Sequence, residues 1–112
     1  MPSTRLANAC LAIGLAVIAA QCLAQPQLQA RTAEDAGRRL YASCAGCHGA
    51  EGKPAPGSSL PPLAGQGREA LAASMKAFQD GSRPSTIMQQ LAKGYTGEQI
   101  DLIAAYLAQR QK

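Results

Sequence analysis

Two cysteines and a histidine that could hold an iron-containing group lie within five consecutive residues. Residues 44–48 read Cys-Ala-Gly-Cys-His, which is the attachment pattern of a c-type haem. At this spacing two thiols can add to the two vinyl groups on one side of the macrocycle, and the next imidazole can reach the iron. The pattern predicts one covalently attached haem c, with thioether bonds at Cys44 and Cys47 and His48 as proximal iron ligand.

Other chemistry of paired cysteines fits the sequence less well. A thiol–disulfide redox motif needs a βαβ setting, and no segment alternates as a strand does. A zinc site needs four ligands, usually Cys and His, but His48 is the only histidine and two of the four cysteines lie near the N-terminus. A disulfide between Cys44 and Cys47 would close a very small ring and leave His48 unexplained.

The second iron ligand is inferred by elimination. With no second histidine, a methionine sulfur remains, and Met1 lies in a segment expected to be removed. Met75 shares a helical stripe with Leu71 and Phe78, as core residues do. Met88 follows a proline-containing turn, from which a side chain can reach across a cavity, and is the expected ligand. Because His/Met ligation raises the reduction potential and fills the iron's sixth position, we expect electron transfer rather than oxygen or peroxide chemistry.

Three further residues are expected to support the haem. The imidazole of His48 should donate its other N–H to a backbone carbonyl, for which Pro61 is the preferred position and Pro62 the competitor. Gly37 lies on the apolar stripe of the first expected helix. A missing side chain there would let the last helix cross closely, near Tyr106.

The sequence predicts an all-α fold of about four short helices that position these residues. Thr32 and Asp35 resemble a capping box, so the first helix is expected to begin at Thr32 and run into Cys44. Residues 46–67 are rich in Gly, Pro and Ser, which predicts a long loop that could wrap one side of the haem. Apolar spacing and a second capping box, Thr96 with Gln99, predict the remaining helices at 68–79, 87–92 and 96–107.

The N-terminal residues resemble an export signal. Residues 1–24 have Arg5 near the start, an apolar run, and a small-residue end before Gln25, so we expect a cleaved signal peptide and a periplasmic protein. The alternative is a retained membrane anchor, but a spanning helix needs about 20 apolar residues and the run is shorter. Residues 25–31 are expected to be a flexible leader, and residues 32–112 the single domain.

The charge and amino-acid composition limit the kinds of partner that the protein can bind. The formal charge of the whole chain is +4, without the basic runs typical of nucleic-acid binding. Four basic side chains could instead ring the haem edge and steer an acidic redox partner, namely Lys53, Lys76, Arg83 and Lys93. With one Phe and no Trp, a domain of this size is short of core material, which a covalent haem would supply.

From about Ala36 onward the chain resembles a class I cytochrome c of the small bacterial c553/c4 type. The resemblance is carried by four strings, at residues 40–49, 61–66, 78–83 and 100–107. It implies the cytochrome c fold, haem ligation by His48 and Met88, and a packed pair of terminal helices.

A narrower resemblance concerns the segment around Met88. Residues 83–88 and 92–96 are similar to the cytochrome subunit of flavocytochrome c sulfide dehydrogenase, which implies docking on a flavoprotein that oxidises sulfide. Three functions are therefore open: a soluble carrier of single electrons, a docking haem subunit of a redox complex, and a haem ligand sensor or enzyme with a labile Met88. Paired carboxylates or a second His near the motif, which an enzyme would need, are absent from the sequence.

Overall fold

The computed structural model describes residues 25–112. The chain divides into two units, residues 1–32 and 33–112, and the second contains every element from α2 (Ala45–His48) onward. The expected signal peptide, residues 1–24, lies outside the described part.

The N-terminal helix is longer than expected at its start and shorter at its end. Residues 25–41 are helical, so the helix does not start at Thr32, and residues 25–31, expected to be a leader, belong to the same helix. The Thr32 hydroxyl donates to the Gln29 carbonyl at 2.8 Å instead of capping a helix. The reason is local, because residues 27–31 contain good helix formers and neither Gly nor Pro.

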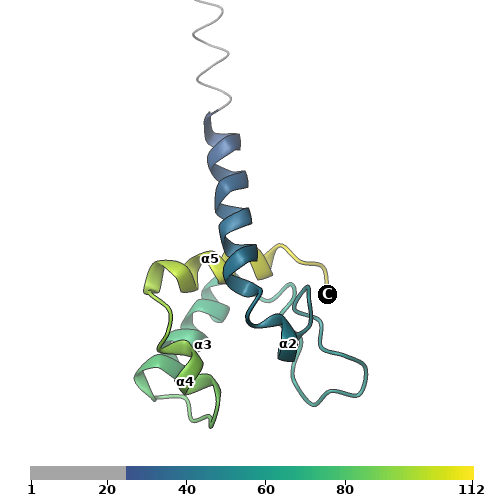
Figure 1. Cartoon of the computed structure of the whole chain (residues 1–112), viewed down its shortest axis with the longest axis vertical. Helices are drawn as coiled ribbons and strands as arrows, with labels where there is room; N and C mark the ends of the chain where they lie inside the picture. Colours follow the sequence, from purple (N-terminus) through teal and green to yellow (C-terminus); the bar gives the residue numbers. More distant parts are fainter. Residues whose placement is uncertain (1–24) are drawn as a thin grey trace, which may run out of the picture. The chain divides into compact units, whose positions relative to one another are not determined.

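Four further helices follow in the described chain (Figure 1). They are α2 (Ala45–His48), α3 (Arg68–Asp80), α4 (Met88–Ala92) and α5 (Gly97–Ala108). No strand occurs between residues 25 and 112, so the expected all-α class is confirmed. A long irregular segment joins α2 to α3, where the prolines and glycines predicted a loop.

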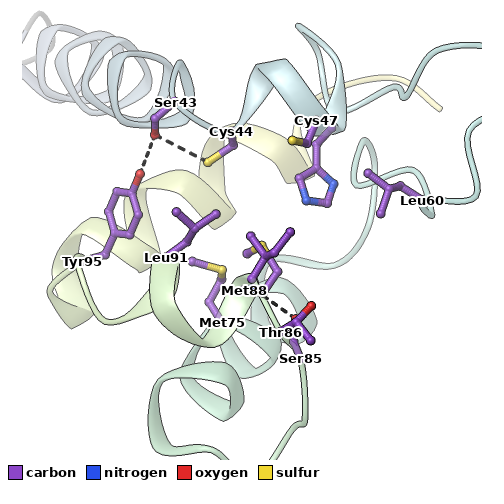
Figure 2. A pocket seen from close by; sticks show the side chains of 12 residues that line it. Ser43, Cys44, Cys47, Leu60, Met75, Ser85, Thr86, Met88, Leu91 and Tyr95 are labelled. Atoms are coloured by element: carbon purple, nitrogen blue, oxygen red, sulfur yellow. Dashed lines mark hydrogen bonds between the residues drawn. The ribbon is translucent and has the colours of Figure 1, made fainter.

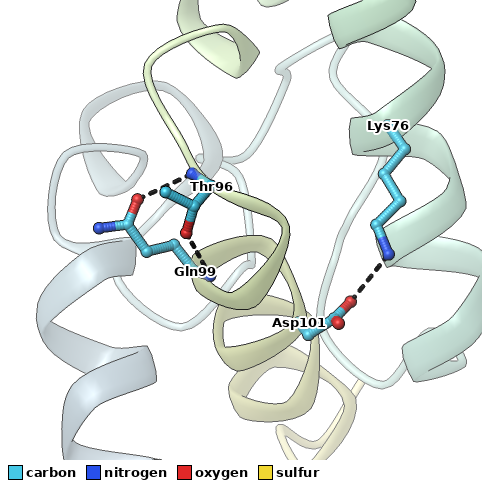
Figure 3. Close-up of polar contacts among 4 residues, drawn as sticks. All are labelled: Lys76, Thr96, Gln99 and Asp101. Atoms are coloured by element: carbon cyan, nitrogen blue, oxygen red, sulfur yellow. Dashed lines mark hydrogen bonds and ion pairs between the residues drawn. The ribbon is translucent and has the colours of Figure 1, made fainter.

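Local residue types mark the start of α5 and the end of α3. The N–H of Gln99 donates to Thr96 Oγ1 at 3.2 Å, and the N–H of Thr96 donates to Gln99 Oε1 at 2.9 Å, so this capping box is confirmed (Figure 3). Gly81 follows α3 with φ +82°, the left-handed conformation that ends many helices.

The core lies between the N-terminal helix, α3 and α5. Its largest fully buried side chains are Tyr41, Tyr106 and Ile100, and the rings of the two tyrosines have centroids 5.7 Å apart. An exposed ion pair between Lys76 of α3 and Asp101 of α5 adds a contact at 3.2 Å (Figure 3). Such surface pairs contribute little, so apolar burial holds these helices together.

Gly37 allows the N-terminal helix and α5 to cross closely. A Cβ placed on Gly37 would lie 2.5 Å from the Leu102 carbonyl oxygen and 2.9 Å from Tyr106 Cβ. The structure therefore brings Gly37 and Tyr106 together, as the apolar stripe predicts.

We expect Gly37→Ala to lower the free energy of unfolding by about 1–3 kcal/mol, because the added methyl overpacks a contact with backbone that cannot give way. Chemical denaturation of the purified protein measures this. Gly97→Ala is the matched control, since a Cβ at that helical glycine meets nothing within 4 Å. Equal stability of the two variants would show that the crossing tolerates a side chain.

Candidate haem site

A single helical turn presents the three residues of the attachment pattern. α2 continues directly from Cys44, whose carbonyl accepts from the His48 N–H at 3.0 Å. Residues at i, i+3 and i+4 share one face of a helix. The spacing of Cys44, Cys47 and His48 therefore places two thiols and an imidazole on the same side.

These side chains open into a cavity of about 360 Å³ (Figure 2). Figure 2 shows Cys44 and Cys47 on one side of it, with Met75 and Met88 facing them from the other. The two cysteines are not joined in a disulfide. The remaining lining residues are Ser43, His48, Leu60, Ser85, Thr86, Ile87, Leu91 and Tyr95. A largely apolar wall with two thiols and one imidazole is suited to a flat apolar macrocycle that carries a metal.

A second cavity, of about 330 Å³, lies against the same residues. It is also lined by His48, Met75 and Met88, and it adds the loop residue Pro61 and the α3 residue Phe78. The long loop therefore forms one wall of the site, as its length suggested.

The imidazole of His48 fits the role of an iron ligand. The ring lines both cavities, and its Nδ1 is buried without a hydrogen bond, so that atom is available for the carbonyl that would orient the ring. Burial also lowers the pKa of His48 from its ordinary value. A lowered pKa favours the neutral ring, the form that binds metals.

The carbonyl expected to hold the imidazole is not engaged in this structure. His48 Nδ1 bonds to neither proline, and the Pro62 carbonyl accepts from Gln66 Nε2 at 2.6 Å. Pro61 does line the second cavity together with His48. Its hydrogen bond to His48 stays a prediction, whereas Pro62 already has a different donor.

Both candidate methionines line both cavities. Met75 also packs against the hydrophobic core, so its interpretation as a core residue was incomplete. Met88 begins α4, and its N–H donates to Ser85 Oγ at 3.1 Å. The serine thus fixes the turn from which Met88 projects.

The four basic residues expected at the haem edge lie in different surroundings. Arg83 lines the second cavity, with its guanidinium 4.7 Å from the centroid of the Phe78 ring. Lys76 is paired with Asp101, and Lys53 and Lys93 line neither cavity.

A buried tyrosine forms a hydrogen bond to the residue that follows the attachment pattern. The Tyr41 hydroxyl donates to the Gly49 carbonyl at 2.7 Å, and the side chain is almost fully buried. Burial raises the pKa of Tyr41 to about 12. The neutral hydroxyl is therefore the form that the fold stabilises.

Tyr41→Phe should lower the free energy of unfolding at neutral pH by about 1 kcal/mol, because the Gly49 carbonyl loses its donor. An unperturbed tyrosine ionises at pH 10.0 and Tyr41 in the fold at about 12. Its contribution is present below pH 10 and is lost as the pH rises towards 12. Between pH 10 and 12 the free energy of unfolding should fall less steeply with pH for the variant than for the wild type. An equal slope for both proteins would contradict the role assigned to Tyr41.

Known proteins place this site in a family. The cytochrome c family model matches residues 34–111. The chain is 44% identical over 79 residues to the cytochrome subunit of sulfide dehydrogenase from Chlorobaculum tepidum, covering 70% of each chain. It is 36% identical over 80 residues to cytochrome c-554(548) from Halomonas halodenitrificans, covering 68% of this chain and 94% of that protein.

A third relative is a longer protein. The thiosulfate dehydrogenase electron acceptor of Thiomonas intermedia is 38% identical over 65 residues, which are 58% of this chain and 30% of the acceptor. The match over most of the domain, together with the attachment residues at one cavity, settles the family and its covalently bound haem c. This chain belongs to the cytochrome c family and is a c-type cytochrome that transfers electrons.

Proposed function

We propose that this protein carries single electrons in the bacterial periplasm on one haem, bound through Cys44 and Cys47 and ligated by His48 and Met88. The observation that carries the proposal is the shared cavity, which is lined by all four side chains. The bound haem supplies the one-electron couple.

The protein's own residues would tune and protect that couple. The two thiols fix the haem covalently, so it is retained in a small domain with a limited core. The neutral imidazole and the thioether sulfur together favour ferrous iron and a raised potential. Apolar side chains at the cavity, Leu60 and Leu91 among them, would exclude water and act in the same direction.

A redox protein is the partner that fits this site. Ile87 and Leu91, on either side of Met88 in sequence, are apolar residues that line the cavity. The part of these side chains that a bound haem leaves uncovered would be available to a partner. The similarity to a cytochrome subunit of sulfide dehydrogenase favours, as the second candidate, a docking haem subunit on a flavoprotein.

Gentle purification from the native host distinguishes the two candidates. A haem-containing eluate without flavin supports a soluble carrier, whereas haem and flavin in fixed ratio support a subunit. In the second case Ile87→Gln should reduce the flavin that co-elutes. Leu28→Gln is the control, because Leu28 is an exposed apolar residue that lines neither cavity.

Export is proposed from residues 1–24, with cleavage before Gln25. Within residues 25–112 no helix has the length and apolar character needed to cross a membrane. N-terminal sequencing of the protein from the native host should begin at Gln25, and an intact Met1 would contradict cleavage.

A further inference from the structure

The hydroxyl groups of Ser43 and Tyr95, two residues that line the haem cavity, form a hydrogen bond with each other. Ser43 directly precedes Cys44, and Tyr95 lies in the turn between α4 and α5. Both line the cavity, and their side-chain oxygens are hydrogen-bonded (Figure 2). Ser43 Oγ also lies 3.9 Å from Cys44 Sγ. The contact therefore links the segment after α4 to a haem-attachment cysteine.

The direction of this hydrogen bond follows from the other partner of Ser43. Ser43 Oγ lies 3.3 Å from the Leu40 carbonyl oxygen, which can only accept. Ser43 therefore donates to Leu40, and Tyr95 donates to Ser43. The Leu40 carbonyl is in the last turn of the N-terminal helix, where no helical N–H reaches it. Ser43 thus caps this helix end, and Tyr95 holds the serine in place.

The backbone of Tyr95 is fixed from a third element. Gln79 of α3 donates through Nε2 to the carbonyls of Ala92 at 2.9 Å and Tyr95 at 2.6 Å. These carbonyls lie at the end of α4 and just beyond it. Tyr95 is therefore held by its backbone to α3 and by its phenol to the segment of Cys44.

We propose that the hydrogen bond between Tyr95 and Ser43, called here the tyrosine tie, keeps α4 close enough for Met88 to stay on the iron. α4 has only five residues, too few to be stable alone, so contacts with neighbouring elements must hold it in place. Tyr95 and Ser43 are thus positioning residues. The inference rests on the proposed ligation by Met88.

Displacement of the sixth ligand by added imidazole tests the tie in the ferric, haem-loaded protein. Tyr95→Phe removes the donor and keeps the ring. We expect imidazole to bind about fivefold more tightly to this variant, the shift that loss of one hydrogen bond supports. Ser43→Ala should give a similar gain, and the double variant should not exceed the larger single effect, since both changes remove one interaction. Ser43→Thr should restore the wild-type affinity.

Ser82→Ala is the matched control. Ser82 Oγ donates to the Ala77 carbonyl at 3.4 Å near the end of α3, so the change again removes a serine from a helix end, but Ser82 lines neither cavity. Its imidazole affinity should equal that of the wild type. Denaturation of each variant shows whether stability alone changes. A Tyr95→Phe affinity equal to the control's, or additive effects in the double variant, would overturn the tie.

The ligand assignment and the tie fail in different ways. The far-red sulfur-to-iron charge-transfer band of the ferric wild type reports a methionine ligand. Its absence from both the wild type and Met75→Leu would remove the ligand assignment itself and the tie with it. The tie alone would be removed by a different set of results. The wild type would show the band, the Met88→Ala variant would lack it, and the Tyr95→Phe variant would bind imidazole as tightly as the wild type does.

Discussion

Met88→Ala is expected to open the sixth coordination position of the haem iron. The sulfur-to-iron charge-transfer band should disappear, and the ferrous variant should bind carbon monoxide rapidly. The midpoint potential should fall by on the order of 0.1 V, because axial ligands set haem potentials over a range of about 0.8 V and a thioether raises them. Absorption spectra and a potentiometric titration measure these changes.

Met75→Leu is the matched control for this prediction. Met75 lines the same two cavities and packs against the core, and leucine conserves most of its volume. The variant should keep the band. If instead Met75→Leu loses the band and Met88→Ala keeps it, the ligand is Met75. Rapid carbon monoxide binding by the wild type would revive the ligand-sensor hypothesis.

Gly49→Ala should prevent the attachment segment from folding as it does in the wild type. Gly49 has φ +81°, which alanine rarely adopts. A Cβ there would also lie 1.7 Å from the Lys53 carbonyl oxygen. We expect the free energy of unfolding to fall by more than about 3 kcal/mol, since backbone strain and overpacking add. Chemical denaturation and the yield of haem-bound protein measure the loss.

Gly46→Ala is the matched control within the same five-residue pattern. A Cβ on this helical glycine meets nothing within 4 Å, so we expect a change of less than about 1 kcal/mol. If Gly49→Ala and the wild type have the same denaturant midpoint of unfolding, the strain assigned to that position is contradicted.

Local signals predicted the elements well where the determining contacts are also local. The capping box of Thr96 and Gln99 marks the start of α5, and Gly81 marks the end of α3. The same kind of signal failed at Thr32, because a Thr followed by an acidic residue can also lie inside a helix. Only the helix-forming residues before it show that the helix continues.

The site was predictable as far as its chemistry depends on spacing. The positions of Cys44, Cys47 and His48 on one helical face follow from the five-residue pattern. Which carbonyl faces His48, and whether Met75 reaches the cavity, depend on how the loop and α3 pack. No short sequence pattern encodes that packing.

Contacts between distant segments were beyond the sequence alone. The tyrosine tie joins residues 52 positions apart. Arg110 near the C-terminus bonds to Glu34 at 2.6 Å and lies 3.6 Å from Glu51, so it links the N-terminal helix to the loop. The hydrogen bond to Glu34 raises the pKa of Arg110 above its ordinary value. Polar side chains on exposed faces give no periodic signal, so such partners emerge only from the fold.

The mass of the protein expressed in a host with intact cytochrome maturation tests the covalent haem most directly. After denaturation and acid–acetone extraction, the peptide containing residues 44–48 should carry the added mass of one haem. The same peptide from the Cys44→Ala, Cys47→Ala double variant should carry none. A wild-type peptide with two unmodified thiols would contradict covalent attachment, and with it the electron-transfer role derived from this site.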